Sequence, residues 1–385
     1  MKLSLNNLSG QRVFNGQRFR NRPSKQRGVA LVSVLFVVAL TAIVAVEMTE
    51  RLQLQIHRTT NLTGSRQAYW YAVGAEHYVK QQLKRINEDP NKRSNTIHAG
   101  QDWAKPLQFP VEGGTIAGEL KDLQACFNLN SLAATVGGPK TTDRTTPAVA
   151  GTPRPSPTRA PAPAAPTSAA RKKGITFEME AFERLLIELE IDTISDAPPE
   201  YLAQRLKDWL DEDGRQTGGG GMEEGDYMAL EIPYLAANTL MTSVSELRLI
   251  GGFTPAVVAK LKPYVCVIPA SQMLKLNVNT LTADTALLLS AMLKGLALDD
   301  AQALISGGQP DGYDKVSDFW EKPEMNQVDS AVKEEAIKYF DVTTSYFELK
   351  AQTSYGDSKF FLNSKLHINQ SKQVTVIARK FGVDL

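Results

Sequence analysis

An uncharged apolar run at residues 29–46 is the first pattern in the chain. It follows a leader, residues 1–28, that carries seven Lys or Arg side chains and no Asp or Glu. Eighteen apolar residues are close to the shortest helix that crosses a hydrocarbon core of about 30 Å. Because a basic leader stays in the cytoplasm, the rest of the chain is expected to be exported. No small-residue cleavage site follows the run, so a membrane anchor is favoured over a signal peptide.

Helix-compatible sequence continues after the run to about Lys84, with Gly64 and Gly74 as its weak points. The second half is amphipathic, which predicts a face that packs on a sheet. The residues expected on that face are Leu52, Ile56, Leu62, Tyr69, Tyr71, Val73 and Tyr78. Trp70 and its two tyrosine neighbours resemble a stacking platform, but packing between helix and sheet is the favoured interpretation.

Alternating polar and apolar residues predict strands near both ends of the exported chain. The first, residues 115–120, follows a Gly113-Gly114 turn. The others are expected at residues 346–353, 359–368 and 374–379. Strands that flank a different central block indicate one split α/β domain, in which the last strands return to the first sheet.

The central block begins with residues 137–174, which are rich in Pro, Ala, Thr and Ser. Such a composition buries too little apolar surface to offset the entropy of ordering, so a flexible connecting loop is predicted. Apolar residues then recur at spacings of three and four, which predicts helices. The expected helices span residues 177–189, 200–210, 245–249, 255–262, 283–293, 298–306, 316–319 and 329–337. Together they predict an all-α insertion.

Composition and motifs argue against catalysis and against nucleic-acid binding. The formal net charge is +1, and the basic excess lies in the leader and the loop. Residues 245–261 resemble a helix-hairpin-helix, but an exported body without a basic stripe disfavours nucleic acid. The chain contains no G-x-S-x-G, H-E-x-x-H, P-loop or G-x-G-x-x-G motif. The four histidines, His57, His77, His98 and His367, are scattered, so surface or packing roles are favoured over metal binding.

Two features could form special sites in an exported protein. Cys126 and Cys266 could form one disulfide, and the alternative is two buried thiols. Residues 208–226 contain seven carboxylates and a run of four glycines. Calcium prefers six to eight oxygen ligands from flexible loops. The segment does not fit an EF-hand, however, and carboxylates alone favour a solvated acidic loop.

Gly28, placed between a basic leader and an apolar helix, resembles the prepilin-peptidase site of type IV pilins and type II secretion pseudopilins. In that family cleavage follows the glycine, here before Val29, and the apolar segment is kept as anchor and filament core. Most members have Glu at the fifth mature position, where this chain has Ser33. The K-type minor pseudopilin of type II secretion also lacks that Glu.

The resemblance to K-type pseudopilins covers nearly the whole exported chain. Its motifs are Arg66 to Ala72, Asp122 to Gln124, Phe127 to Asn130, Asp208 to Asp211, Tyr234 with Ala236 to Asn238, Ser243 to Arg248, and Asn277 to Thr280. Each motif is weak alone, but their order is specific. The resemblance also favours calcium in the acidic segment, with the expected ligands Asp208, Asp211, Asp213, Glu223, Glu224 and Asp226.

The implied fold is α+β and type IV pilin-like, with a long N-terminal helix packed on an antiparallel sheet and a large all-α insertion. The expected parts are a leader (1–28), a membrane and filament-core helix (29–46), a pilin-like part (47–136), a loop (137–174), the helical insertion (175–338) and C-terminal strands (339–385).

The implied function is a minor pseudopilin at the pseudopilus tip that initiates assembly and supports export across the outer membrane, and not an enzyme. The alternative is a single-pass periplasmic binding module that docks secretion substrates through its helical domain. The implied partners are the I-type and J-type minor pseudopilins, the major pseudopilin, the inner-membrane platform and prepilin peptidase. The expected location is the inner membrane, with the bulk of the chain in the periplasm.

Overall fold

The computed structural model describes residues 29–88, 96–134, 175–308 and 311–382. The predicted leader, residues 1–28, and the predicted loop, residues 137–174, lie outside the described residues. The chain divides into two units, residues 1–62 and 63–385. Helix α1, Val29–Glu88, begins at the residue that the sequence predicts. Its first part is long and apolar enough to cross a membrane, and there the Ser33 hydroxyl donates to the Val29 carbonyl at 2.5 Å.

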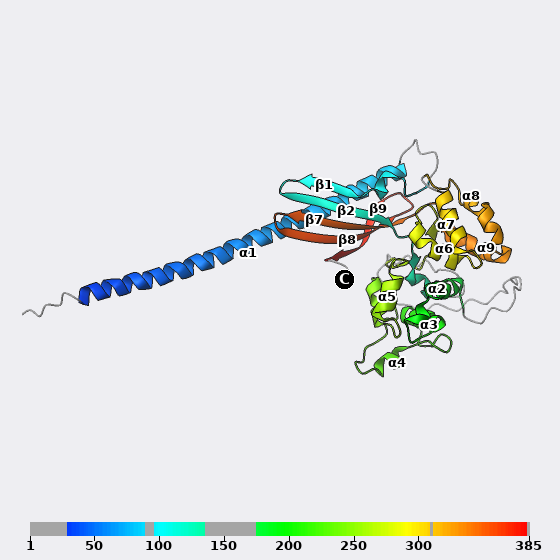
Figure 1. The fold of residues 1–385 in the computed structure, drawn as a ribbon, viewed down its shortest axis with the longest axis horizontal. Coiled ribbons are helices and arrows are strands. Elements are labelled where there is room, and N and C mark those ends of the chain that lie inside the picture. Colours follow the sequence, from blue (N-terminus) through cyan, green and yellow to red (C-terminus); the bar gives the residue numbers. More distant parts are fainter. Residues whose placement is uncertain (1–28, 89–95, 135–174, 309–310, 383–385) are drawn as a thin grey trace, which may run out of the picture. The chain divides into compact units, whose positions relative to one another are not determined.

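A five-stranded antiparallel sheet forms the first layer of the second unit (Figure 1). Its order is β1-β2-β7-β8-β9. The strands are β1 Leu107–Val111, β2 Gly114–Asp122, β7 Tyr346–Tyr355, β8 Ser358–Ile368 and β9 Val374–Phe381. The C-terminal strands therefore join the N-terminal hairpin, as the sequence predicts, with Leu120 opposite Leu349. Strand β1 was not predicted, because only Leu107 is fully buried and Pro110 interrupts its alternation.

Small side chains of α1 make the buried contact with this sheet. Of the predicted packing face, Tyr69, Tyr71 and Tyr78 lie beside that contact, where their rings meet Phe360, Tyr355 and Phe109 of the strands. The buried α1 residues are Gly64, Ala68, Ala72, Ala75, Val79 and Leu83, together with Glu76. They recur every three or four residues, whereas Trp70 lies on another side of the helix and is 63% exposed. Leu52, Ile56 and Leu62 are also exposed. Alanine allows the close approach to Phe347 and Leu349 that larger residues would prevent.

The buried Glu76 carboxylate is paired within this helix-sheet layer. Arg379 of β9 donates to both its oxygens at 2.7 Å, and the Ser364 hydroxyl of β8 donates at 2.7 Å. These donors hold the pKa of Glu76 below its usual range even though burial opposes them. A bidentate pair of this kind fixes the rotation of α1 against β8 and β9.

A second core is made by the helices that follow residue 174. They are α2 Phe177–Glu188, α3 Pro199–Leu210, α4 Glu224–Met228, α5 Pro255–Leu261, α6 Ala286–Met292, α7 Leu298–Gly307, α8 Val316–Trp320 and α9 Ser330–Ala336. The predicted segment 245–249 forms a 3₁₀ helix, η4 Val244–Leu249. Helix α4 was not predicted. Helix α2 starts where the Thr176 hydroxyl accepts from the Met179 N–H at 3.3 Å.

Two short parallel pairs connect the helical part to the sheet. Strand β3, Phe127–Asn128, pairs with β4, Val265–Cys266. Strand β5, Leu276–Asn277, pairs with β6, Phe340–Asp341. In its described part the predicted insertion, residues 175–338, thus consists of helices and loops and of the two short strands β4 and β5. The helical core also takes in Phe127 from the first half of the pilin-like part.

Asp122, at the end of β2, is the polar centre of this junction. Its carboxylate accepts from the Thr280 hydroxyl at 2.6 Å, the Thr344 hydroxyl at 2.7 Å and the Gln124 N–H at 2.7 Å. The Asn277 amide adds a fourth hydrogen bond at 3.1 Å. Burial raises the pKa of Asp122, and the four donors oppose that rise. One side chain therefore ties the end of β2 to β5 and to the segment that leads into β7.

Cys126 and Cys266 form a disulfide beside the β3–β4 pair, with Cα atoms 5.8 Å apart. Unreduced, denatured protein is expected to show no reactive thiol, and reduction should destabilise the fold by about 4 to 5 kcal/mol in the chain-entropy description of a loop this long. Thiol titration before and after reduction, combined with urea unfolding, measures both effects. Two reactive thiols in the unreduced protein would mean that the sulfurs are not joined.

Candidate metal site

The C-terminal end of α3 carries the candidate site. The helix starts with proline at its first position and buries Leu206 and Trp209 in the core. Asp208 lies between these two residues in the chain and is also buried, with 0% of its surface exposed. Asp211 is the C-cap of the helix. Carboxylates at a helix C-terminus face the negative end of the helix dipole. The fold therefore holds two negative charges where the backbone does not favour them.

A glycine loop packs directly on the same helix. Gly218 has φ of 65°, a conformation that favours glycine. The Gln204 side chain accepts from the Gly220 N–H at 2.8 Å, and Arg205 donates to the Gly220 carbonyl at 3.0 Å. A Cβ atom at Gly221 would collide with the Asp208 carboxylate. The loop thus needs glycine to bring the chain back across Asp208.

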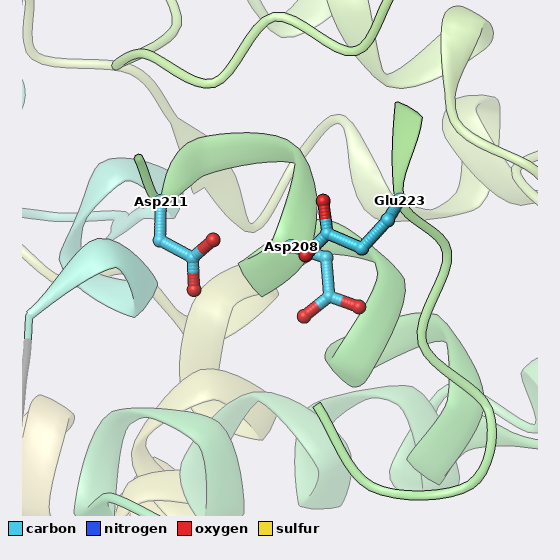
Figure 2. A group of neighbouring side chains, drawn as sticks. All are labelled: Asp208, Asp211 and Glu223. Atoms are coloured by element: carbon cyan, nitrogen blue, oxygen red, sulfur yellow. The ribbon is translucent and has the colours of Figure 1, made fainter. Parts of the chain in front are cut away.

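After this loop, Glu223 reaches the α3 carboxylates (Figure 2). Oxygen atoms of Asp208, Asp211 and Glu223 lie within 4.8 Å of one another. Glu223 is 7% exposed. Both of its carboxylate oxygens, and Oδ1 of Asp211, lack a hydrogen-bond partner in the described part of the chain. Unpartnered buried carboxylate oxygens are costly unless something compensates their charge.

The electrostatics of the three carboxylates agree with this geometry. Burial, then the charges of Asp213 and Asp208, raises the pKa of Asp211 to about 7. Burial, then the charges of Asp208 and Asp211, raises the pKa of Glu223 to about 7. Burial also raises the pKa of Asp208, although the Thr217 N–H donates to it at 3.0 Å. At neutral pH the cluster therefore favours either protons or a cation.

The other three predicted ligands lie outside this group of three. Asp213 is exposed and accepts from the Arg215 N–H at 2.9 Å. Asp226 accepts from the Glu223 N–H at 2.9 Å and from the Gln216 amide at 2.7 Å, so it orients the backbone of Glu223. Glu224 is exposed. The sequence shows which segment is acidic, but not which of its side chains turn inward.

The donor set fits a hard divalent cation. All three side chains offer carboxylate oxygen, and residues 208–226 contain no Cys or His. Zinc prefers nitrogen and sulfur, whereas calcium takes oxygen ligands with flexible geometry. The residues present therefore fit calcium better than zinc.

The anchor-like helix, the antiparallel sheet on its second half and the helical insertion define a pilin-like protein. Family models described as "Type II secretion system (T2SS), protein K" match residues 125–270 and 276–342. The chain is 32% identical over 373 residues to type II secretion system protein K of Aeromonas hydrophila, covering 93% of this chain and 98% of that protein. It is 33% identical over 365 residues to the protein K of Pectobacterium carotovorum, covering 93% and 97%.

The fold also matches a solved structure, the GspK-GspI-GspJ complex from the type 2 secretion system of enterotoxigenic Escherichia coli. The TM-score is 0.66 at 26% identity, and the match covers 85% of this chain and all of that chain. The chain belongs to the type II secretion system protein K family and is a minor pseudopilin of type II secretion. The family is one of structural pseudopilins and is not known for catalysis.

Proposed function

We propose that this minor pseudopilin occupies the tip of the pseudopilus, initiates its assembly and supports protein export across the outer membrane. The observation that supports this proposal is the position at which the helical part is joined to the sheet. It departs after the end of β2 at Asp122 and returns before the start of β7 at Tyr346. Phe347, at that end of the sheet, opposes Asp122.

The contacts of α1 with β8 show which end of the helix lies near this end of the sheet. Gly64 lies against the β7–β8 turn, where a Cβ atom at this position would collide with Ser358. Glu76, further along α1, accepts a hydrogen bond from Ser364 in the middle of β8. The β2–β7 end therefore lies toward the C-terminal end of α1. A bulky helical part at that end leaves no flat surface on which another subunit of similar shape could stack.

Ser33 supports the same position. An uncharged side chain that bonds its own helix at the Val29 carbonyl needs no opposite charge from a neighbour. Burying it in the bilayer or in a filament core costs less than burying a carboxylate. The Glu that most pseudopilins carry at this position is credited with pairing to the new N-terminus of a neighbouring subunit. A subunit at the tip has no pseudopilin above it and therefore does not need that charge. Cleavage after Gly28 lies outside the described residues and stays a prediction, as does the location of the bulk of the chain in the periplasm.

The proposed partners are the I-type and J-type minor pseudopilins, since the solved relative is a GspK-GspI-GspJ complex. The major pseudopilin, the inner-membrane platform and prepilin peptidase are proposed as further partners. The full chain, mixed in detergent with the I and J proteins of its own system, is expected to elute as one complex with a 1:1:1 mass by light scattering. The major pseudopilin is the matched control, and a mixture that elutes as separate proteins would contradict the proposed partners.

We also propose that the acidic site holds calcium. Asp208, Asp211 and Glu223 would be the side-chain ligands, and Asp226 would position Glu223 through its bond to the backbone. Asp213 and Glu224 would lower the local potential from outside the group. A bound divalent cation supplies positive charge that offsets the repulsion among the carboxylates. It would fix the Gly218 to Gly221 loop on α3.

A further inference from the structure

A cleft of about 430 Å³ lies between the outer face of the sheet and the segment η4–α5. Along β7, Leu349 and Ala351 face α1, so the alternate residues Glu348 and Lys350 face the other side of the sheet. The register continues this outer row, because Lys350 opposes Asn363 and Asn363 opposes Lys380. Val244, Val258 and Val267 supply an apolar part of the lining.

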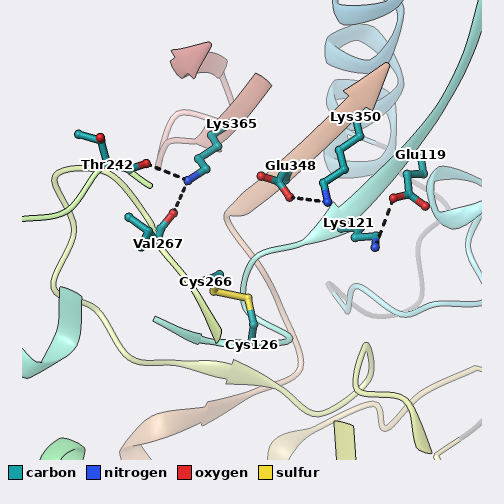
Figure 3. A network of polar contacts seen from close by, with 9 residues as sticks. All are labelled: Glu119, Lys121, Cys126, Thr242, Cys266, Val267, Glu348, Lys350 and Lys365. Carbon is teal, nitrogen blue, oxygen red and sulfur yellow. Dashed lines mark hydrogen bonds and ion pairs between the residues drawn. A yellow bond between two sulfur atoms is a disulfide. The ribbon is translucent and has the colours of Figure 1, made fainter. Parts of the chain in front are cut away.

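The charge of the cleft is strongly positive. Its lining contains six Lys or Arg side chains and a single carboxylate, Glu348, in a chain whose formal net charge is only +1. Glu348 pairs with Lys350 at 3.7 Å, and Arg379 pairs with Glu76 in the α1 layer. Figure 3 shows Lys365 donating to the carbonyls of Val267 at 2.7 Å and Thr242 at 3.3 Å.

Two of the cations are not compensated within the described part of the chain. The side chains of Arg248 in η4 and of Lys262, the C-cap of α5, are exposed and make no hydrogen bond or ion pair there. They face the cleft from the helical side, opposite Lys365 and Lys380 of the sheet. The β3–β4 pair and the Cys126–Cys266 disulfide lie beside Lys365, so the two walls are tied together (Figure 3).

The combination of charge and apolar surface selects the kind of ligand. The cations come from three neighbouring strands and two helices, and strands β7 and β9 are two spacings, about 9.6 Å, apart. One small anion cannot reach cations that far apart, and it gains nothing from three valines. An extended peptide carries alternate side chains to one face, so its carboxylates can meet several cations while its apolar residues cover the valines.

We propose that this cleft binds an acidic, partly apolar peptide segment of a partner protein. Arg248 and Lys262 supply the charge from the helical wall, and Lys350, Lys365 and Lys380 supply it from the sheet. The site is separate from the acidic loop after α3, and it does not depend on calcium or on a tip position.

The test uses the full chain in detergent and a dye-labelled eight-residue peptide of alternating glutamate and leucine, with binding followed by fluorescence anisotropy. The double variant Arg248→Gln, Lys262→Gln should weaken binding by about tenfold or more. The matched control Lys260→Gln, Lys294→Gln removes the same charge outside the cleft and should bind as the parent does. A glutamine-leucine peptide should bind at least about tenfold more weakly than the glutamate peptide. Raising the salt concentration from about 0.05 to 0.5 M should weaken the binding of the glutamate peptide and leave that of the glutamine peptide unchanged.

Three results would overturn the proposal. Equal losses in the cleft variant and in the control would show that net charge alone attracts the peptide. Inorganic phosphate that displaces the peptide at equal concentration would identify a small-anion site. A peptide that does not bind at all would leave the cleft without the proposed ligand. Thermal melting of both variants checks that they are folded, which is expected because all four side chains lie at or near the surface.

Discussion

Chelation of calcium should lower the melting temperature of the full chain by about 5 to 10 °C relative to calcium at 100 times its Kd. Binding only to the folded state stabilises it by RT ln(1 + [L]/Kd), which is about 2.7 kcal/mol at that ratio. A change of 1 kcal/mol shifts the midpoint of a domain of 150 to 250 residues by about 2 to 4 °C. The helical part is the region expected to melt first, because Asp208, Asp211 and Glu223 join α3 to the loop before α4.

The same carboxylates predict how pH changes the effect. The pKa values of Asp211 and Glu223 are raised to about 7 in the folded, metal-free protein. The stability that comes from protonating them is present below their unfolded pKa values, near 4, and is lost as the pH rises to about 7. Stability in chelator should therefore fall across this range. The gain from calcium should be larger at pH 7.5 than at pH 5, where protons compete with the cation.

The double variant Asp211→Asn, Glu223→Gln keeps the side-chain shapes and removes two charges. It should melt at the same temperature in calcium and in chelator. Glu212→Gln with Glu231→Gln removes two exposed carboxylates from the same region and should keep the calcium response. Differential scanning calorimetry measures these melting temperatures, and elemental analysis measures the bound calcium. Equal melting of the parent in both buffers, with no calcium found, would leave only a solvated acidic loop.

Asp122→Ala should destabilise the chain by at least about 4 kcal/mol. The substitution leaves four buried or partly buried donors, on Gln124, Asn277, Thr280 and Thr344, without their acceptor. Each unsatisfied buried group costs about 1 to 3 kcal/mol. Asp122→Asn should cost less, because its amide oxygen still accepts and the threonine hydroxyls can rotate.

Urea unfolding with the disulfide intact measures these differences. Thr280→Val, which removes one of the four bonds, is the matched partial variant and should lie between the parent and Asp122→Ala. A free energy of unfolding for Asp122→Ala within 1 kcal/mol of the parent would show that the junction does not depend on this carboxylate.

Regular periods in the sequence predicted most of the elements. Strands β7 and β8 alternate clearly, and β2 and β9 alternate in part. Helices α2 and α3 show the spacing of amphipathic helices beside Thr176 and Pro199. Strand β1 failed this test, because an edge strand with Pro110 and one fully buried residue carries little alternation. Helix α4 failed because five residues at the end of an acidic, Gly-rich segment are too short to show a helical period.

Packing partners were harder to predict than elements. The aromatic residues near Trp70 suggested the buried face of α1, but alanine at positions 68, 72 and 75 forms its centre, and Tyr69 and Tyr71 contact the sheet from its sides. Close helix-sheet contact favours small residues, and composition alone does not reveal which side makes it. In the same way, seven carboxylates marked the candidate metal segment, but the glycine loop at Gly218 to Gly221 brings Glu223 back to α3, and the acidic composition alone does not show this.

The most direct test of the proposed tip position is to label the helical part on assembled filaments. A short epitope inserted between Pro153 and Pro157, in a segment predicted to be a flexible connector, can be detected with gold-conjugated antibody on pseudopili sheared from secreting cells. The account predicts one label at one end of each filament, and the same epitope on the major pseudopilin should label the whole length. Labels of the minor pseudopilin distributed along the shaft would contradict the tip position.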